Sequence, residues 1–461
     1  MNFLDKIREI KRKELAGENS FVMKEVKKAG HSFIRAVSGG RKKGLRLIAE
    51  IKKASPSAGE LRKEINLKET LAVYGKYADA VSVVTEPKFF NGSLSLLREV
   101  KQNTKLPVLA KDFVIDARQI IGLRENGADA VLLISNLVPL EKLNSLISFT
   151  ESLGMDAVVE CECPNSLRKV LKSRAKIVGI NNRDLHSLKV NPKNFDKMEK
   201  LIPKRKKNSL ALVAESGFSE RQQIEAIEGK ADAVLVGSAL MKARNLESKL
   251  KELKGIPLVK ICGITNAVDA KMCEESGADF IGFNFFKESP RYVVPEKAKK
   301  IISGLKGKAV PVGVFVNHSK EEVGKIARES GVQMLQFSGD ESTAFVNSFP
   351  NGFKAIRAEN AADLSAANAF KNELVLIDAK KEGFYGGTGK KVNAKILMEL
   401  KKMHGKKVFL AGGITPENVK GILRTFKPYC IDVASGAEEK PGEKSERKLN
   451  RLLNNIMEAR K

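Results

Sequence analysis

The sequence has no tryptophan and only five cysteines and four histidines among its 461 residues. The cysteines lack the regular spacing of a disulfide framework, which argues against a small secreted domain and favours a reducing compartment. Cys161 and Cys163 are the one closely spaced pair. Because histidines are so few and so scattered, we interpret this pair as ordinary residues at a strand end and expect no metal site.

Long apolar runs are also missing. No stretch approaches the roughly 18 consecutive apolar residues of a membrane span, and Met1–Leu15 has the pattern of a charged amphipathic helix without a signal peptide's apolar core. Hydrophobic residues make up 42% of the chain, as in globular proteins. The sequence therefore predicts a cytoplasmic protein with no membrane partner.

Acidic residues are fewer than basic ones: 55 Asp and Glu residues against 82 Lys and Arg residues give a net charge of +27. Such an excess can mark a nucleic-acid-binding protein, which would show binding with a steep salt dependence. Here the lysines are spread along the whole chain, often beside glutamates as in Lys24-Glu25 and Lys68-Glu69, with no basic tail. We interpret them as a solvated surface that helps to collect anionic substrates, and we expect no nucleic-acid partner.

A short repeat indicates how the chain is organised. The tetrapeptide ADAV begins at Ala78, Ala128 and Ala231, and the related GADFI begins at Gly277. The spacings fit a unit of about 25 residues, one strand plus one helix, repeated along the chain. Each copy follows a helical stretch and opens an apolar, β-rich run, which is typical of parallel βα units.

Apolar runs that end in polar residues or glycine predict two successive sets of eight strands. The first set is Leu47–Lys52, Ala80–Val84, Pro107–Lys111, Ala130–Ile134, Ala157–Glu160, Ile177–Asn181, Leu210–Glu215 and Ala233–Val236. The second set is Leu258–Cys262, Phe280–Phe283, Val310–Val314, Met334–Phe337, Phe353–Arg357, Leu374–Asp378, Val408–Ala411 and Ile431–Ala434. These sets favour an α/β fold of two tandem (β/α)8 TIM barrels over one doubly wound sheet.

The boundary between the barrels is predicted in Leu253–Pro257, a short break between a helix and a strand. Residues 1–254 would form the first barrel and residues 256–461 the second. The chain before the first strand should add an N-terminal helical extension over one barrel mouth. Its first helix would bury a face made of Phe3, Leu4, Ile7 and Ile10.

In such barrels the active site lies at the carboxyl ends of the strands. In the first barrel, so many charged side chains at one mouth exceed what stability requires and indicate a catalytic site. The last two strands end in Glu-Ser-Gly and Val-Gly-Ser, whose free N–H groups suit a phosphate. The strand-end candidates are Glu50, Lys52, Ser55, Glu86, Lys111, Glu160, Asn181, Arg183, Glu215, Ser216, Gly217, Gly237 and Ser238.

Several segments of this half together resemble the indole-3-glycerol phosphate synthase family. They are IAEIKKASPSAG, TEPKFFNGS, PVLAKDF, the strand end at Glu160, GINNRDL, AESGF and VLVGSALM, which span most of residues 1–254. The resemblance implies ring closure of a carboxyphenylamino-deoxyribulose phosphate with loss of CO₂ and water. This half of the chain would then be a lyase that needs no cofactor.

The resemblance also implies a role for each matching residue. Lys111 would be the general acid and Glu160 its partner base, with Glu50 and Asn181 orienting them and Lys52 neutralising the reacting carboxylate. A lysine acid needs a pKa lowered towards neutrality, which we expect a second lysine and partial burial to supply. Arg183 would lie beside the anthranilate ring, and the phosphate would be held by Ser55, Gly217, Gly237 and Ser238.

The second set of strands ends in a different group of candidate catalytic and binding residues. Cys262 ends the first strand as a candidate base or nucleophile, although a packed small residue is an equally good interpretation of it. For Cys273 and Cys430 the packed small residue is the favoured interpretation. Asp378 ends the sixth strand. Arg291 lies after the second strand, free to pair with a substrate carboxylate. Candidate phosphate-binding residues are Gly386, Gly387, Gly389, Gly412, Gly413, Ser435 and Gly436.

This half, about residues 256–461, resembles the phosphoribosylanthranilate isomerase family through KICGIT, SPRYV, VGVFVN, LIDAKKEGFYGGTGKK, LAGGITPENV and IDVASGAE. The resemblance implies an Amadori rearrangement without a cofactor. Cys262 would be the general base, Asp378 the general acid, and Arg291 the ligand of the anthranilate carboxylate. The family usually has QLHGDE after the fourth strand, whereas this chain has QFSGDE with Ser338 in place of histidine, which predicts altered affinity.

The two implied reactions are consecutive, because the isomerase product is the synthase substrate. The sequence therefore predicts a bifunctional tryptophan-biosynthesis enzyme that acts on small phosphorylated anthranilate substrates, and we expect it to be a monomer. The alternative is another pair of phosphate-binding barrels, as in histidine or thiamine biosynthesis. Those would not combine the lysine and serine of KASPSAG with the cysteine of KICG.

Overall fold

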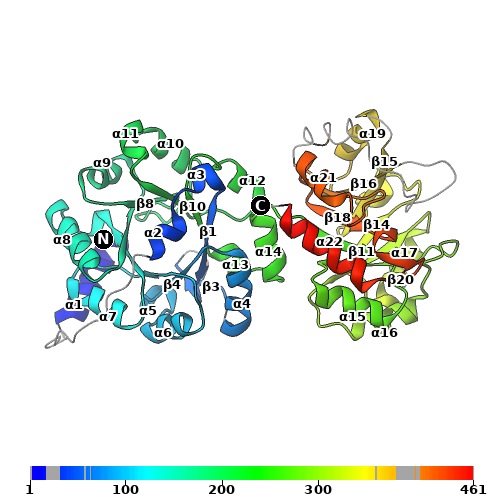
Figure 1. Cartoon of the computed structure of the whole chain (residues 1–461), viewed down its shortest axis with the longest axis horizontal. Coiled ribbons are helices and arrows are strands. Elements are labelled where there is room, and N and C mark those ends of the chain that lie inside the picture. The colour runs from blue at the N-terminus through cyan, green and yellow to red at the C-terminus, as the bar shows by residue number, and fades with distance from the viewer. Residues whose placement is uncertain are drawn as a thin grey trace. The chain divides into compact units, whose positions relative to one another are not determined.

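The computed structural model describes residues 3–16, 32–56, 59–62, 64–358, 361–379, 400 and 405–459. The chain divides into two compact units, Met1–Lys254 and Gly255–Lys461. Eight of the strands described in each unit form a closed parallel barrel, and helices alternate with them along the chain (Figure 1). The predicted pair of tandem (β/α)8 barrels is confirmed.

The first barrel closes by pairing of its first strand with its second and its last. Its strands are β1 (Arg46–Ile51), β4 (Ala80–Val84), β5 (Val108–Lys111), β6 (Ala130–Ile134), β7 (Asp156–Cys161), β8 (Ile177–Asn181), β9 (Ala211–Glu215) and β10 (Ala233–Val236). The helices between and after them include α4 (Leu67–Tyr77), α6 (Leu94–Gln102), α7 (Ala117–Glu125), α8 (Leu140–Ser152), α9 (Pro164–Lys172), α10 (Asn194–Lys200), α12 (Arg221–Glu225) and α14 (Leu246–Leu253).

The second barrel repeats this order and closes by pairing of β11 with β18. Its strands are β11 (Leu258–Cys262), β12 (Phe280–Asn284), β13 (Val310–Phe315), β14 (Met334–Phe337), β15 (Gly352–Ala358), β16 (Leu374–Ala379), β17 (Lys407–Leu410) and β18 (Cys430–Val433). Its helices include α15 (Ala267–Ser276), α16 (Pro295–Ser303), α17 (Lys320–Ser330), α18 (Thr343–Asn347), α19 (Ala361–Ser365), α21 (Val419–Thr425) and α22 (Glu446–Glu458).

Aromatic side chains fill the second barrel near the beginnings of its strands. The ring of Phe409 lies 5.1 Å from that of Phe280 and 5.3 Å from that of Phe353, measured between centroids. Cys430 packs into the same buried cluster, and Cys273 is buried as well, which confirms that these two cysteines serve as small core residues. This apolar layer supports the polar strand ends that follow it along each strand.

The repeated aspartates explain why the ADAV pattern recurs. Asp79 stands before β4, and its carboxylate accepts a hydrogen bond from the backbone N–H of Leu47 in β1 at 2.8 Å. Asp129, Asp232 and Asp279 accept in the same way from the first residues of the preceding strands, at 2.8 to 2.9 Å. Each aspartate therefore satisfies a strand-end donor that the parallel ladder leaves unpaired. The repeat marks the beginnings of strands, away from the catalytic ends.

The N-terminal extension covers both ends of the first barrel, so the expectation of one mouth was only partly correct. Helix α1 (Phe3–Ala16) lies at the carboxyl ends, where Lys11 Nζ pairs with Asp112 Oδ1 at 2.9 Å just after β5. Helix α2 (Ser32–Val37) lies at the opposite end, where the N–H of Ile34 donates to the carboxylate that opens β7, at 2.9 Å. In α1, Leu4 and Ile7 are buried, whereas Phe3 and Ile10 are half-buried.

None of the helices within the described ranges is long and apolar enough to cross a membrane.

Candidate active sites

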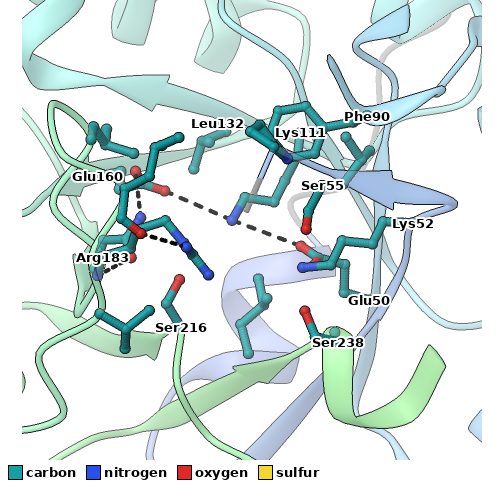
Figure 2. Close-up of a pocket in the computed structure, with 18 of the residues that line it drawn as sticks. Glu50, Lys52, Ser55, Phe90, Lys111, Leu132, Glu160, Arg183, Ser216 and Ser238 are labelled. Atoms are coloured by element: carbon teal, nitrogen blue, oxygen red, sulfur yellow. Dashed lines mark hydrogen bonds and ion pairs between the residues drawn. The ribbon is translucent and has the colours of Figure 1, made fainter. Parts of the chain in front are cut away.

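A cavity of about 280 Å³ opens at the carboxyl ends of the first barrel's strands (Figure 2). Twelve of the thirteen strand-end candidates line it: Glu50, Lys52, Ser55, Glu86, Lys111, Glu160, Asn181, Arg183, Ser216, Gly217, Gly237 and Ser238. Glu215 lies beside them and contacts Lys111. Because each of these side chains comes from the end of a strand or the loop after it, the barrel itself brings together residues that are distant in sequence.

Lys111 is at the centre of the charged cluster. Its Nζ lies 2.7 Å from Glu215 Oε2, 3.7 Å from Glu160 Oε2 and 3.9 Å from Glu50 Oε2. Asn181 Nδ2 donates to Glu160 Oε1 at 3.0 Å and fixes that carboxylate from the far side. One half-buried ammonium therefore faces three buried carboxylates, an arrangement that can hold or release a proton.

The three carboxylates shift the pKa of Lys111 in the direction opposite to the one that the sequence predicted. Burial would lower the pKa of Lys111, but the charges of Glu215, Glu160 and Glu50 raise it well above its usual value. The expected lowering was wrong because the second lysine, Lys52, is itself neutralised by Glu50 at 2.8 Å. Burial and the neighbouring Glu160 instead raise the pKa of Glu215 to about 7, although Lys111 opposes them.

Two glycines make room for these charged groups. A Cβ atom at Gly237 would lie 2.1 Å from Glu50 Oε1, and one at Gly179 would lie 2.3 Å from Glu215 Oε1. Any side chain at either position would displace a carboxylate of the cluster. Gly179 was missed as a site residue, although glycine inside a strand is the usual sign of a close approach.

The opposite side of the cavity suits a phosphate. Ser216 and Gly217 both have a left-handed backbone, with φ of 65° and 83°, a conformation that turns successive N–H groups towards one concavity. The hydroxyl oxygen of Ser55 is buried without a hydrogen-bond partner among the described residues. Ser238 begins the short helix α13 (Ser238–Met241). These groups can donate to an anion.

Aromatic side chains form the remaining wall, and sequence reasoning missed them. Phe3 from α1, Phe90 from the short helix α5 (Pro87–Phe90) and Phe113 after β5 all line the cavity. The presence of Phe90 in TEPKFFNGS and of Phe113 in AKDF could have signalled an apolar ring-binding surface. Glu86, also on the cavity wall, accepts hydrogen bonds from the N–H groups of Lys88 and Phe89 and caps α5.

A second cavity, of about 440 Å³, lies at the carboxyl ends of the second barrel's strands. The predicted residues that line it are Cys262, Arg291, Asp378, Gly412, Gly413 and Ser435. Gly436 follows Ser435 and has no room for a side chain, because a Cβ atom there would lie 1.9 Å from the carbonyl oxygen of Ile414. The other three glycines of the prediction, Gly386, Gly387 and Gly389, fall outside the described residues.

A buried ion pair stands next to the Cys262 thiol. Lys260 is fully buried, and its Nζ lies 3.0 Å and 3.1 Å from the two carboxylate oxygens of Asp432. Burial raises the pKa of Cys262, while the positive charge of Lys260 opposes that rise. Gly282 on the next strand leaves room for the sulfur, since a Cβ atom there would lie 2.7 Å from Sγ.

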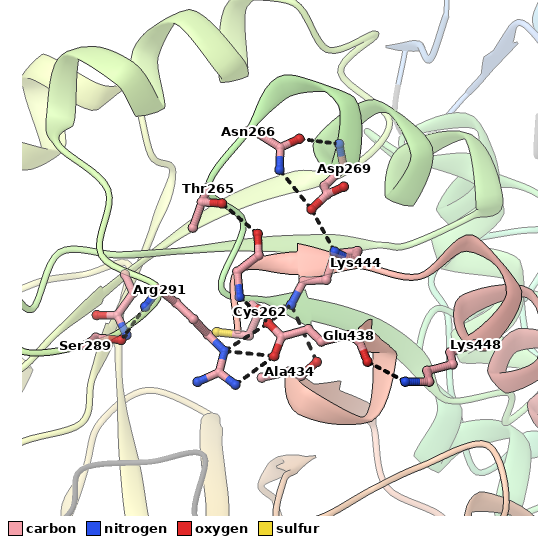
Figure 3. Close-up of polar contacts among 12 residues, drawn as sticks. Cys262, Thr265, Asn266, Asp269, Ser289, Arg291, Ala434, Glu438, Lys444 and Lys448 are labelled. Carbon is pink, nitrogen blue, oxygen red and sulfur yellow. Dashed lines mark hydrogen bonds and ion pairs between the residues drawn. The ribbon is translucent and has the colours of Figure 1, made fainter. Parts of the chain in front are cut away.

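Arg291 is not free, as the sequence suggested, but is held by Glu438 (Figure 3). Its Nε and Nη2 lie 2.9 Å and 2.7 Å from the two oxygens of that carboxylate. The prediction failed because the partner lies 147 positions further along the chain, in the segment ASGAE after the last strand. Gly263 leaves room for the Arg291 side chain, because a Cβ atom at Gly263 would lie 2.3 Å from Arg291 Cδ.

Three further polar residues of the second cavity were not predicted. They are Asp432, Arg357 and Gln336. Arg357 Nη2 donates to the carbonyl of Ser338 at 2.5 Å, and Gln336 Nε2 lies 3.0 Å from the Ser338 hydroxyl. The serine that replaces the usual histidine is therefore engaged by its neighbours on the cavity wall. The sequence signal for these residues was their position at strand ends.

The chain matches two known families in order. Residues 4–253 match the family described as Indole-3-glycerol phosphate synthase, and residues 259–455 match N-(5'phosphoribosyl)anthranilate (PRA) isomerase. The Tryptophan biosynthesis protein TrpCF of Vibrio parahaemolyticus is 34% identical over 432 residues, which cover 92% of this chain and 87% of that protein. The protein of the same name from Haemophilus influenzae is 32% identical, with 98% and 95% covered.

Solved structures are similar to part of the chain. The phosphoribosyl anthranilate isomerase of Thermus thermophilus has 35% sequence identity and a TM-score of 0.41. The match covers 44% of this chain and 98% of that structure.

Proposed function

Because this chain belongs to the family of bifunctional tryptophan-biosynthesis proteins that join an indole-3-glycerol phosphate synthase to a phosphoribosylanthranilate isomerase, we propose that the two barrel mouths are its two active sites. The synthase reaction belongs to the first barrel and the isomerase reaction to the second. The observation that supports both assignments is the convergence of acid, base and anion-binding groups at the strand ends of each barrel.

In the first barrel, Lys111 would donate to the ketone oxygen of the substrate and then assist departure of the hydroxyl group. Glu160, held by Asn181, would accept the proton from the closing ring. Lys52 would neutralise the carboxylate that leaves as CO₂. The raised pKa of Lys111 implies that it stays charged, so much of its effect is electrostatic stabilisation of the developing oxyanion. Glu215, whose pKa burial raises to about 7, can take up or release a proton near neutral pH.

The other cavity residues would bind the substrate. The ring would lie against the aromatic wall and Arg183, and the phosphate would be bound by Ser55 and by backbone N–H groups of the last two strand ends, Gly217, Gly237 and Ser238. The Ser55 hydroxyl, buried with no partner in the described part of the chain, supports this orientation, because a buried polar atom without a partner is costly unless a ligand satisfies it.

In the second barrel, Asp378 would protonate the ribose ring oxygen as the C1′–O bond breaks, which opens the ring and leaves a protonated imine. Cys262, as thiolate, would then remove the proton from C2′, and the enolamine formed would rearrange to the ketone. The anthranilate carboxylate would pair with Arg291. The phosphate would be held by Gly412, Gly413, Ser435 and Gly436, together with Gly386, Gly387 and Gly389. No redox or group-transfer partner is needed, because the isomerisation conserves all atoms.

We further propose that the protein is a monomer in the cytoplasm. Each barrel forms a closed sheet with its own predicted site, so no second copy is needed to complete either one.

Each half should fold and keep one activity when expressed separately. Residues 1–254 should catalyse only ring closure and residues 256–461 only the isomerisation, because each barrel closes on its own strands. Anthranilate fluorescence with each substrate measures both rates, and the whole chain is the control. If the fragments were both inactive while the whole chain worked, the assignment of a complete site to each barrel would be wrong.

Glu215→Gln should make the stability of the first barrel depend less on pH. Burial holds the pKa of Glu215 at about 7, above its usual 4.5, so the folded chain binds this proton more tightly than the unfolded chain. That stabilisation is complete below the unfolded pKa and is lost as the pH rises through the folded pKa. Between about pH 5 and pH 8, wild type should lose on the order of 1–3 kcal/mol that the variant does not lose.

Denaturant unfolding of residues 1–254 at both pH values measures this difference, since a two-domain chain need not unfold in one step. Glu225→Gln is the matched control, because that exposed carboxylate pairs with Arg221 on its own helix, at 2.9 Å, away from the charged cluster. The same pH dependence in wild type and Glu215→Gln would show that Glu215 ionises normally.

A further inference from the structure

A buried chain of charged groups connects the two proposed functional residues of the second site (Figure 3). Glu438 binds Arg291 through both carboxylate oxygens. Its Oε1 also accepts from Lys444 Nζ at 2.6 Å, and Lys444 Nζ donates in turn to the backbone carbonyl of Cys262 at 2.6 Å. The guanidinium and the strand end that carries the thiol are thus joined through two residues.

These two residues belong to a small hairpin that follows the last strand. Glu438 and Lys444 are paired across β19 (Glu438–Lys440) and β20 (Glu443–Lys444). The hairpin is anchored to the loop and helix after β11: Thr265 Oγ1 donates to Gly442 O at 2.7 Å, and the Lys444 N–H donates to Asp269 Oδ2 at 2.8 Å. It therefore ties the end of the last barrel strand to the end of the first.

The burial of this pair is costly unless it serves a purpose. The side chain of Lys444 is fully buried and that of Glu438 is 3% exposed. Two charges that are taken out of water gain little net stability from each other, and such pairs are best explained where they fix a geometry. Neither residue is among the described residues that line the second cavity, which favours an indirect role for both.

The pair determines which edge of Arg291 is presented to the cavity. A guanidinium has five N–H donors in a fixed plane, and Glu438 takes the edge made by Nε and Nη2. Arg291 lines the cavity while its side chain is only 15% exposed. The edge made by the two terminal nitrogens is then the one available for a bidentate contact with a substrate carboxylate.

We propose that Glu438 and Lys444 are positioning residues of the isomerase: Glu438 fixes the plane of Arg291 for the substrate carboxylate, and Lys444 fixes the strand end that carries Cys262. This inference rests on the proposed roles of Arg291 and Cys262. It adds that the two roles are coupled, since one hairpin holds both groups at their working separation.

Glu438→Gln should weaken substrate binding by the isomerase. An amide has one acceptor oxygen and no charge, so it cannot keep both Arg291 contacts and the Lys444 contact. We expect KM to rise about 10- to 100-fold, the loss typical of a charge-assisted pair, with a smaller fall in kcat. Lys444→Met should do the reverse and lower kcat more than it raises KM, because it acts on the Cys262 strand end.

Glu439→Gln is the matched control. Glu439 is the next residue of the hairpin, and its exposed carboxylate contacts Lys448 at 3.2 Å. This variant should keep isomerase constants within about twofold of wild type, as expected for an exposed pair. Hydrogen exchange of α15 and α22 in the whole chain reports whether the second barrel remains folded. Should Glu438→Gln unfold it, Glu438→Asp retains the charge with a shorter reach and should show an intermediate KM.

A double-mutant cycle with Arg291→Met separates positioning from simple stability. If Glu438 acts through Arg291, Glu438→Gln should change KM by less than about twofold once the guanidinium is gone. Additive effects in the double variant would overturn the inference and leave Glu438 a structural residue. An unchanged KM in Arg291→Met alone would instead refute the proposed carboxylate-binding role, so the two failures give different results.

Discussion

Replacing Lys111 with methionine should slow the synthase about 10²- to 10⁴-fold, the range for a lost general acid, and leave the isomerase rate unchanged. Methionine keeps most of the volume of the lysine stem but carries no proton or charge. The effect should be large because the Lys111 ammonium contacts all three carboxylates of the cluster, Glu50, Glu160 and Glu215. Steady-state rates of both reactions on the same sample measure it.

Lys105→Met is the matched control, since that lysine is exposed and precedes the same strand. Lys111→Arg then separates two ways of acting, because arginine keeps the charge but does not give up a proton in proteins. Substantial activity in the arginine variant would favour electrostatic stabilisation, as the raised pKa of Lys111 suggests. A methionine variant within threefold of wild type would remove Lys111 from the mechanism.

The barrel architecture could be predicted because its signals are local. Parallel strands covered by helices are apolar along their whole length and become polar where they leave the sheet. The predicted strands Ala80–Val84, Ala130–Ile134 and Leu258–Cys262 match the structure at both ends. Since the carboxyl ends all open on one mouth, the fold prediction also places most candidate side chains together.

The interactions that could not be predicted depend on distances across the barrel. Glu438 and Arg291 are far apart in sequence and meet only because the last strand closes against the first. The pKa of Lys111 depends on which carboxylate each lysine contacts, and a list of strand-end residues does not contain that information. The split of the N-terminal helices between the two barrel ends depends likewise on contacts with Asp112 and Asp156, which only folding brings near.

Cys262→Ala should abolish most of the isomerase activity, with a loss of about 10²- to 10⁴-fold, while the synthase continues at its normal rate. Alanine removes the proposed base with almost no change in volume, and the Lys260–Asp432 pair beside it remains. Asp378→Asn should be as damaging, because an amide cannot donate the proton that opens the ring. Isomerase and synthase assays of the same whole chain measure both effects.

Cys273→Ala is the control for removal of a thiol, because that cysteine is buried in α15 outside the second cavity. Chemical modification provides a second measurement. Iodoacetamide should inactivate the isomerase, faster as the pH rises because burial raises the pKa of the Cys262 thiol, and a substrate analogue should protect it. Cys163 is also partly exposed, so the reaction is run in a Cys163→Ala chain. Retention of most isomerase activity by Cys262→Ala would mean that this cysteine is a packed small residue and that the base is another group.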